Sequence, residues 1–319
     1  MYNPLVSIII PVYNGANYVQ NAIECALNQT YTNIEVLVIN DGSNDNGETE
    51  TAVKKYENRV RYIKKENGGV SSALNLAIRE MRGEWFSWLS HDDAYYPDKV
   101  KKQVEAVNML METEKLPKEK IVIYGANERI DKHGDVILKK KFNVKNQENN
   151  IDLILSNIKH YIICGCAVLV SKEALLRVGG FNEQIRTVSD AECFYKLLFD
   201  GCRFYFLYDV LVQSRQHKSQ VGKTKAELLE RETDDFHVWM LEEILKHPEW
   251  ISKDNLLKFL EGVSFRGCNK ASRRAISEIE KRFGGDACKR EIKKIAFKSS
   301  VKRGARLFVR GIYRKIVVK

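Results

Sequence analysis

The sequence predicts an α/β fold with a mainly parallel central sheet and a helical C-terminal region. Short apolar runs alternate with segments of helical periodicity over the first 95 residues, and helices that connect strands in this way produce parallel sheets. The first run, residues 5–11, is almost continuously apolar, which is typical of a strand covered on both faces. The length of 319 residues favours about two domains.

The elements are expected in a regular order. In the first part we expect strands at residues 5–11, 34–39, 60–63 and 85–89. We expect helices at residues 18–29, in the segment that ends near residue 56, and from residue 71 or 72 to residue 81. In the second part we expect strands at 121–126, 167–170, 204–207 and 210–214, a hairpin turn at 131–135, and helices at 98–114 and 172–178. A further helix starts near Ser189 or Asp190, and either side chain can serve as its N-cap.

Composition and charge exclude several classes of protein. No apolar stretch approaches the roughly 18 residues of a membrane span, and no secretory signal opens the chain. The seven cysteines include no Cys-x-x-Cys pair, so we expect reduced thiols in the cytoplasm and no disulfide framework or zinc site. Residues 289–319 hold 12 Lys or Arg and a single acid. The formal net charge of +10 therefore belongs to the tail, and the rest of the chain is close to neutral.

The apolar run at residues 85–89 ends in Ser90, His91, Asp92 and Asp93. This pattern predicts a buried strand that delivers two acids to its carboxyl end, the edge of an α/β sheet where ligands bind. Two carboxylates there suit a divalent cation that also holds phosphates. The alternative is an acidic turn without a ligand, because Asp is a common turn residue.

Polar motifs lie at the ends of several predicted elements, and their order is informative. The motifs are Ser7–Asn14, Asn40–Ser43, Asn67–Gly69, Trp88–Asp93, Gly179–Glu183 followed by Ser189–Asp190, and Arg215-x-His217. Together they resemble the family 2 glycosyltransferases over roughly the first 220 residues, and an ordered set is more specific than any one motif.

The resemblance implies an A-type glycosyltransferase (GT-A) fold, which is Rossmann-like and binds a nucleotide sugar. It also implies an inverting enzyme of bacterial surface-glycan synthesis. The donor would be a nucleotide diphosphate sugar, UDP-linked in preference to dTDP-linked, and the group moved a hexosyl or deoxyhexosyl. We expect a catalytic domain over residues 1–221, with a nucleotide-binding half (1–95) and an acceptor half (96–221). Residues 222–319 would form the helical region.

The nucleotide-sugar-binding residues that the resemblance implies are Pro11, Tyr13, Asn14, Asp41, Asn67, Gly69, Ser71, Asp92, Arg215 and His217. The Asp41 carboxylate would accept from the N–H of uracil or thymine, and Arg215 would donate to the diphosphate. An Asp-Gly turn is the alternative role for Asp41. The chain departs from the family at Leu74, where an Arg often precedes the Asn found here at position 75.

The implied cofactor is Mg²⁺ or Mn²⁺ held by Asp92, Asp93 and His217, where it would neutralise charge on the leaving diphosphate. Asp92 matches the second acid of the family's Asp-x-Asp motif. Ser90 stands at the first acidic position and His91 in the middle, so a water or the imidazole would have to replace the missing carboxylate.

Asp190 matches the family's general base, which takes the proton of the attacking sugar hydroxyl. Glu192, two residues later, is the substitute. A single base that faces the leaving diphosphate gives inversion by direct displacement. A structural N-cap is the alternative role for Asp190, and one residue can serve both purposes.

The C-terminal tail has the pattern of a cationic amphipathic helix. Lys302, Arg306, Arg310 and Arg314 recur every four residues, opposite Val301, Ala305, Phe308, Val309, Ile312 and Ile316. Such a helix can lie in a bilayer interface and is attracted by anionic lipid. We expect a protein peripherally attached to the inner surface of the cytoplasmic membrane, acting on a glycan or lipid-linked acceptor. A helix packed on its own domain is the alternative.

Two other functions are alternatives to glycosyl transfer. A nucleotidyltransferase would require a Gly-rich phosphate loop, which Pro11–Asn14 does not provide. A nucleic-acid- or membrane-binding protein without catalysis would use the basic tail. Because the body is close to neutral and its basic residues are not interleaved with aromatics, we expect no nucleic-acid partner.

Overall fold

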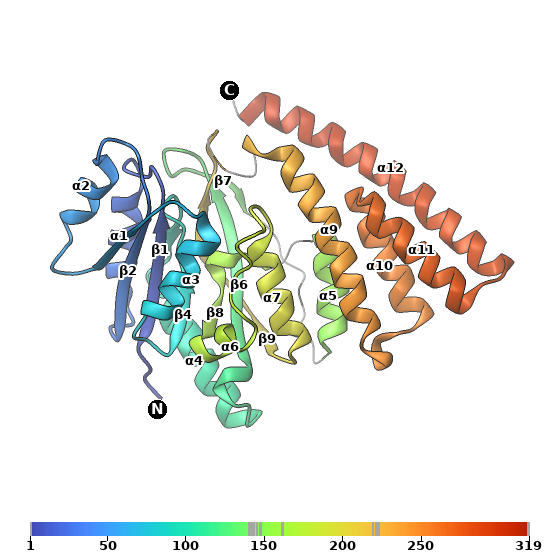
Figure 1. Ribbon diagram of the computed structural model, residues 1–319, viewed down its shortest axis with the longest axis horizontal. Coiled ribbons are helices and arrows are strands. Elements are labelled where there is room, and N and C mark those ends of the chain that lie inside the picture. Colours follow the sequence, from blue (N-terminus) through green and yellow to red (C-terminus); the bar gives the residue numbers. More distant parts are fainter. Residues whose placement is uncertain are drawn as a thin grey trace. The chain divides into compact units, whose positions relative to one another are not determined.

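The computed structural model (Figure 1) describes residues 2–139, 144, 146, 149–160, 163–218, 220 and 224–317, with the backbone alone at 139, 160 and 305–317. The chain divides into two compact units. Unit 1 comprises Met1–Asn150 and Ile162–Lys225, and unit 2 comprises Ile151–Tyr161 and Ala226–Lys319. Each unit is described by itself below.

The strands described in unit 1 form one sheet in the order β3-β2-β1-β4-β8-β6-β9-β5, with β7 beside β6. Their bounds are β1 (Val6–Val12), β2 (Ile34–Asp41), β3 (Arg61–Lys65), β4 (Trp85–Trp88), β5 (Ala94–Tyr95), β6 (Ile121–Ile130), β7 (Val136–Lys139), β8 (Leu169–Ser171) and β9 (Arg203–Arg215). β3, β2, β1 and β4 are parallel, as predicted. β8 runs antiparallel between β4 and β6, and β5 antiparallel to β9. The sheet is therefore mixed, and only its first half is wholly parallel.

Helices pack on both faces of the sheet. They are α1 (Val19–Leu27), α2 (Glu48–Lys54), α3 (Val70–Glu80), α4 (Lys99–Thr113), α6 (Lys172–Arg177) and α7 (Ser189–Phe199), with 3₁₀ turns η1 (Lys118–Lys120) and η2 (Gly165–Ala167). All seven residues of β1 are buried. Ile8 and Ile10 share one core cluster with residues of α1, α2 and α4, whereas α3 packs on β1 and β2 through Ala73, Leu74 and Ala77. Side chains alternate between the two faces of a strand, which explains why β1 is apolar throughout.

One prediction in the second half of unit 1 changes and another is confirmed. The strands expected at 204–207 and 210–214 are a single strand, β9, which has a register shift against β6 near Gly125. The hairpin turn before β7 is confirmed: the Asp131 carboxylate accepts from the backbone N–H groups of His133, Gly134 and Asp135 at 2.8 to 3.0 Å.

Unit 2 is helical, as predicted for the C-terminal region. Its helices are α5 (Asn150–His160), α9 (Ala226–Leu245), α10 (Lys253–Arg266), α11 (Asn269–Phe283) and α12 (Asp286–Val317), with the 3₁₀ turn η3 (Pro248–Trp250). α9 to α12 are drawn gold to red in Figure 1. α5 was not predicted from the sequence; it joins α10 through a hydrogen bond from Arg266 Nε to the carbonyl of Ile158 at 2.6 Å.

Two negative findings apply to the described residues. No helix among them is long and apolar enough to cross a membrane. All seven cysteines are free thiols, in agreement with the prediction of reduced cysteines.

Candidate active site

The carboxyl ends of β1 and β2 are joined by a network of short polar side chains. The Asn14 amide donates to Asn44 Oδ1 at 2.7 Å and accepts from the Asn44 backbone N–H at 2.9 Å. Asn14 has a positive φ of 49°, a backbone conformation that Asn tolerates better than most residues. Tyr13 is 43% exposed at this edge, whereas Pro11 is buried within β1. Tyr13 and Asn14 are thus in position to meet a ligand, and Pro11 shapes the strand beneath them.

Asp41, at the end of β2, is nearly buried, and both of its carboxylate oxygens are engaged. Oδ1 accepts from Lys65 Nζ at 2.7 Å and from the Gly68 N–H at 3.0 Å. Oδ2 accepts from the Gly69 N–H at 2.7 Å and from the Asn67 amide at 3.3 Å. Asp41 therefore orders the turn that starts α3. To accept a hydrogen bond from a nucleotide base, it would have to exchange one of these donors.

The start of α3 meets the start of α7. Ser71 is buried, and its hydroxyl donates to Ser189 Oγ at 2.8 Å. α7 begins at Ser189 with Val188 as its N-cap, and no side chain caps it. The prediction that Ser189 or Asp190 caps this helix is therefore wrong, because the Ser189 hydroxyl is used to bind Ser71.

Asp190 lies at the first turn of α7 and is half-buried. Burial raises the pKa of its carboxylate, against hydrogen bonds from the backbone N–H groups of Asp190 and Ala191 that lower it. A Cβ on Gly165 would lie 2.8 Å from the Trp88 ring and 3.5 Å from Asp190 Oδ2. Glycine at 165 thus allows the end of β4 and the start of α7 to approach each other closely.

Glu192, the substitute base, is placed differently. It is 7% exposed, its Oε1 pairs with Lys196 Nζ at 3.1 Å, and its Oε2 has no hydrogen-bond partner among the described residues. Asp190 is the more accessible carboxylate of this turn.

The turn after β4 is fixed from β9. Arg215 is 6% exposed; its backbone N–H donates to Asp93 Oδ1 and its Nε to the Asp92 carbonyl, both at 2.9 Å. Its guanidinium also lies 4.9 Å from the centre of the Tyr18 ring. In this structure Arg215 holds the Asp92–Asp93 turn, and its contact with a diphosphate stays a prediction. Tyr18, which the sequence analysis missed as a site residue, also lies beside His217, with ring centroids 5.5 Å apart.

Asp92 and His217, the cation ligands that the resemblance implies, lie side by side. Asp92 Oδ2 and His217 Nε2 are 2.8 Å apart, which is the distance of an ordinary hydrogen bond. One ion bound by both atoms would take the place of their hydrogen bond. By their chemistry, a carboxylate and an imidazole suit a divalent cation whose other ligands are waters or phosphate oxygens.

The other residues of the predicted metal site face elsewhere. Asp93 is buried; burial, and then the charge of Asp92, raise its pKa to about 7. Ser90 Oγ lies 3.3 Å from Cys166 Sγ. His91 packs against Gly15, where a Cβ would come within 2.4 Å of its ring, and burial lowers its pKa. The described residues contain no group of three or more His, Cys, Asp or Glu that could hold an ion by themselves.

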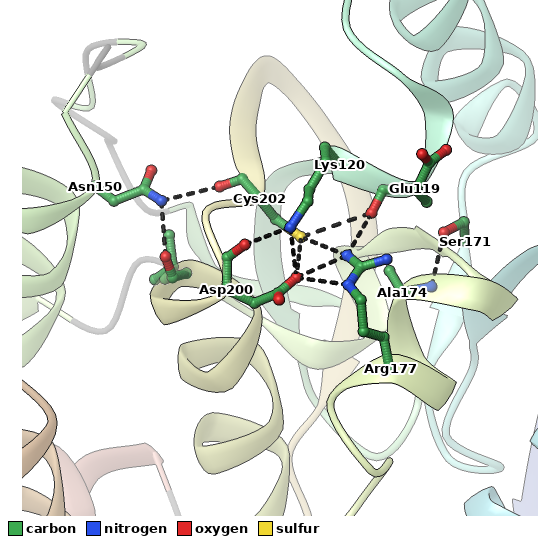
Figure 2. Close-up of polar contacts among 9 residues, drawn as sticks. Glu119, Lys120, Asn150, Ser171, Ala174, Arg177, Asp200 and Cys202 are labelled. Atoms are coloured by element: carbon green, nitrogen blue, oxygen red, sulfur yellow. Dashed lines mark hydrogen bonds and ion pairs between the residues drawn. The ribbon is translucent and has the colours of Figure 1, made fainter.

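The far end of α7 is held by a polar cluster, which Figure 2 shows. Asp200, the C-cap of α7, accepts from Arg177 Nε at 2.8 Å and from Lys120 Nζ at 2.9 Å. Arg177 Nη2 also donates to the carbonyl of Glu119 at 2.8 Å. Although burial acts to raise it, these hydrogen bonds lower the pKa of Asp200. Both ends of α7 are thus bonded to other elements of unit 1, through Ser71 at one end and through Arg177 and Lys120 at the other. These contacts limit the movement of Asp190.

Comparisons with known proteins agree with this arrangement. A glycosyltransferase of Rickettsia prowazekii, itself uncharacterized, is 39% identical over 264 residues, which is 83% of this chain and 80% of the relative. The chondroitin synthase of Pasteurella multocida is 34% identical over 61% of this chain but only 19% of its own length. Staphylococcus aureus TarS (residues 1–349), solved with UDP-GlcNAc, superposes with a TM-score of 0.63 at 15% identity, covering 95% of this chain and 91% of that chain.

The structural likeness confirms the predicted GT-A fold, with helices added in the C-terminal region. The family model described as "Glycosyl transferase family 2" matches residues 7–177, more than half of the chain and most of unit 1. The matched range includes the residues that follow β1, β2 and β4 at the candidate site. This chain belongs to glycosyl transferase family 2.

Proposed function

We propose that the protein transfers a sugar, with inversion, from a nucleotide diphosphate sugar to a hydroxyl of a glycan or lipid-linked acceptor in bacterial polysaccharide synthesis. The observation that carries the proposal is that two carboxylates of different character lie near the end of β4. Asp92, which lies four residues beyond the end of β4, is paired with His217. Asp190 stands at the start of α7, where Gly165 lets that helix approach Trp88. One site suits a diphosphate and the other an acceptor hydroxyl.

The chemistry follows from these two sites. Asp190 takes the proton of the acceptor hydroxyl while that oxygen attacks the anomeric carbon, and the bond from this carbon to the diphosphate oxygen breaks. The pKa of Asp190, raised by burial, favours proton transfer to it, since a base works best when its pKa approaches the operating pH. A bound Mg²⁺ or Mn²⁺, held by Asp92 and His217, would neutralise charge on the departing diphosphate. Attack from the side opposite the leaving group inverts the configuration at the anomeric carbon.

A UDP-sugar is the proposed donor, with a dTDP-sugar as the alternative. Support comes from the UDP-GlcNAc held by TarS. The exposed Tyr13 ring beside Asn14 and Asn44 adds a surface on which a base can stack. The chondroitin synthase relative favours an acceptor that is a growing polysaccharide and a hexosyl donor.

A panel of UDP-, dTDP- and GDP-sugars, scored by thermal shift with and without Mn²⁺, tests the proposal. A donor present at 100 times its Kd stabilises the folded state by about 2.7 kcal/mol. We expect a rise in Tm for a UDP-sugar that requires Mn²⁺, followed by release of UDP when acceptor is supplied. If no nucleotide sugar raised the Tm and none were turned over, the proposed function would be wrong.

We further propose that the protein is cytoplasmic and attached peripherally to the cytoplasmic membrane through α12. Phe297 and Val301 lie one turn apart on this helix and are 75% and 59% exposed, with Lys298 and Lys302 beside them in the sequence. Cys288, Ile292 and Ser299 of the same helix are buried, so part of α12 packs on its own unit. The side chains of residues 305–319, where most of the predicted amphipathic pattern falls, lie outside those described.

Deleting residues 305–319 should release the protein from vesicles of anionic lipid while sparing turnover with a soluble acceptor. The deletion removes Arg306, Arg310 and Arg314 but leaves the packed part of α12. Raising the salt concentration should also weaken binding of the full chain to vesicles. Salt screens the basic side chains, whose attraction already reaches only about 8 Å at physiological ionic strength. Vesicle sedimentation and thermal melting check both results. An early-melting truncation, together with a full-length chain that never sediments with vesicles, would instead identify α12 as a packing element.

A further inference from the structure

Asn75 on α3 is joined to a segment more than one hundred residues away in the sequence. Its Nδ2 donates to the carbonyl of Phe181 at 2.8 Å, and its Oδ1 accepts from the Phe181 N–H at 2.9 Å. The same Nδ2 donates to Glu183 Oε1 at 2.8 Å. An amide that exchanges two hydrogen bonds with one residue imitates a backbone pairing. The contact therefore fixes the backbone of Phe181 and not only its side chain.

Gly180 permits this contact. It has a φ of +66°, and a Cβ there would lie 2.6 Å from Asn75 Oδ1. A side chain at 180 would be strained by the backbone and would displace the Asn75 amide. The Gly-Gly-Phe sequence at 179–181 is thus fitted to receive an asparagine from α3.

The ring of Phe181 contacts one residue on each of the two segments that carry the carboxylate sites. It is 2% exposed, with its centroid 6.2 Å from that of Trp88 and 6.4 Å from that of Phe194, both in edge-to-face contact. Trp88 ends β4, four residues before Asp92. Phe194 lies one helical turn after Asp190 on α7. A change in the position of Phe181 would therefore move the two sites relative to each other.

We propose that Asn75 is a positioning residue for sugar transfer, which fixes Phe181 and thereby sets the distance between the Asp92 turn and Asp190. The proposal rests on the proposed function of these two carboxylates. Both ends of the Asn75 amide are taken up by Phe181 and Glu183, so it acts through them. Misplacement of a reacting group by about 1 Å can reduce the rate about 10²-fold, whereas donor binding at the β1, β2 and β4 ends does not use Phe181.

The test compares Asn75→Ala and Phe181→Leu with Glu183→Ala as the matched control. Phe181→Leu keeps an apolar side chain and the backbone pairing but removes the ring that lies between Trp88 and Phe194. Glu183→Ala removes only the exposed contact of the same amide. For each variant, calorimetry gives the affinity for UDP with Mn²⁺, and UDP release gives kcat and KM for transfer with the donor that the nucleotide-sugar panel identifies. Thermal melting reports the fold.

We expect kcat to fall about 10- to 10²-fold in Asn75→Ala and Phe181→Leu, with the affinity for UDP unchanged and Glu183→Ala close to wild type. Unchanged kcat in a folded Phe181→Leu protein would overturn the proposal, as would kcat and UDP affinity that fall together in step with Tm. If Asn75→Ala does not fold, Phe181→Leu decides alone. If these variants keep full kcat while Asp190→Asn is inactive, the positioning role fails and the proposed function stands. An Asp190→Asn protein with full turnover contradicts the function itself.

Discussion

Replacing Asp190 by asparagine is expected to slow sugar transfer at least about 10²-fold, the usual contribution of a general base. The asparagine keeps the size of the side chain, and its amide oxygen can still accept from the first-turn N–H groups that Asp190 engages, so the fold should be unchanged. Binding of UDP with Mn²⁺ should also be unchanged, because the substitution leaves Asp92 and His217, the proposed ligands of the cation, as they are. Initial rates of UDP release at saturating donor, compared with calorimetric binding of UDP, separate the two effects.

Glu192→Gln is the control for Asp190→Asn. It changes a carboxylate two residues away that is buried and already paired with Lys196, so it should have a much smaller effect on kcat. A fully active Asp190→Asn enzyme would show that another group takes the proton. A Glu192→Gln enzyme with the larger loss would identify that group.

The second large effect is expected for Asp92→Asn, which should abolish metal-dependent binding of UDP. An amide carries no negative charge, and a divalent cation that has only one or two protein ligands depends strongly on each carboxylate. Arg215 holds this turn through the Asp92 carbonyl and not through its side chain, so the fold should be unchanged. Calorimetry with UDP, in the presence and absence of Mn²⁺, measures the effect.

Two comparisons sharpen the Asp92→Asn experiment. His217→Gln removes the partner of Asp92 and should weaken the response to Mn²⁺ without abolishing it, since one carboxylate remains. Asp45→Asn changes another acid that lies just after β2 and accepts hydrogen bonds from Thr49, and it should leave the metal response intact. If Asp92→Asn bound UDP and Mn²⁺ as the wild type does, Asp92 would be a turn residue only.

The parallel half of the sheet could be predicted because its residues carry the signal locally. β1 is buried along its whole length, and such a strand is recognisable from an apolar run between turn residues. Strand direction in the second half is not encoded in this way. β8 has only three residues, and it is antiparallel to both of its neighbours, which no local pattern indicates. α5 was missed because its partner α10, which supplies Arg266, lies about a hundred residues further along the chain.

The candidate site could be predicted as a set of positions but not as a set of contacts. Asp92, His217 and Asp190 were identified from motifs, and the structure pairs the first two. Arg215 was expected to face a ligand because Arg is suited to phosphate. In this structure it is buried on the Asp92–Asp93 turn, more than one hundred residues away in the sequence. Asn75 was identified only as a motif position, and its pairing with Phe181 depends on the fold.

The stereochemistry of the product tests the central claim most directly. The claim is a single displacement, in which Asp190 activates the acceptor and no covalent sugar-enzyme intermediate forms. The measurement is the ¹H NMR signal of the anomeric proton in the product formed from an α-linked UDP-sugar and an acceptor sugar. The account predicts a β-linked product from the start of the reaction. An α-linked product would mean retention of configuration and would contradict the proposed role of Asp190.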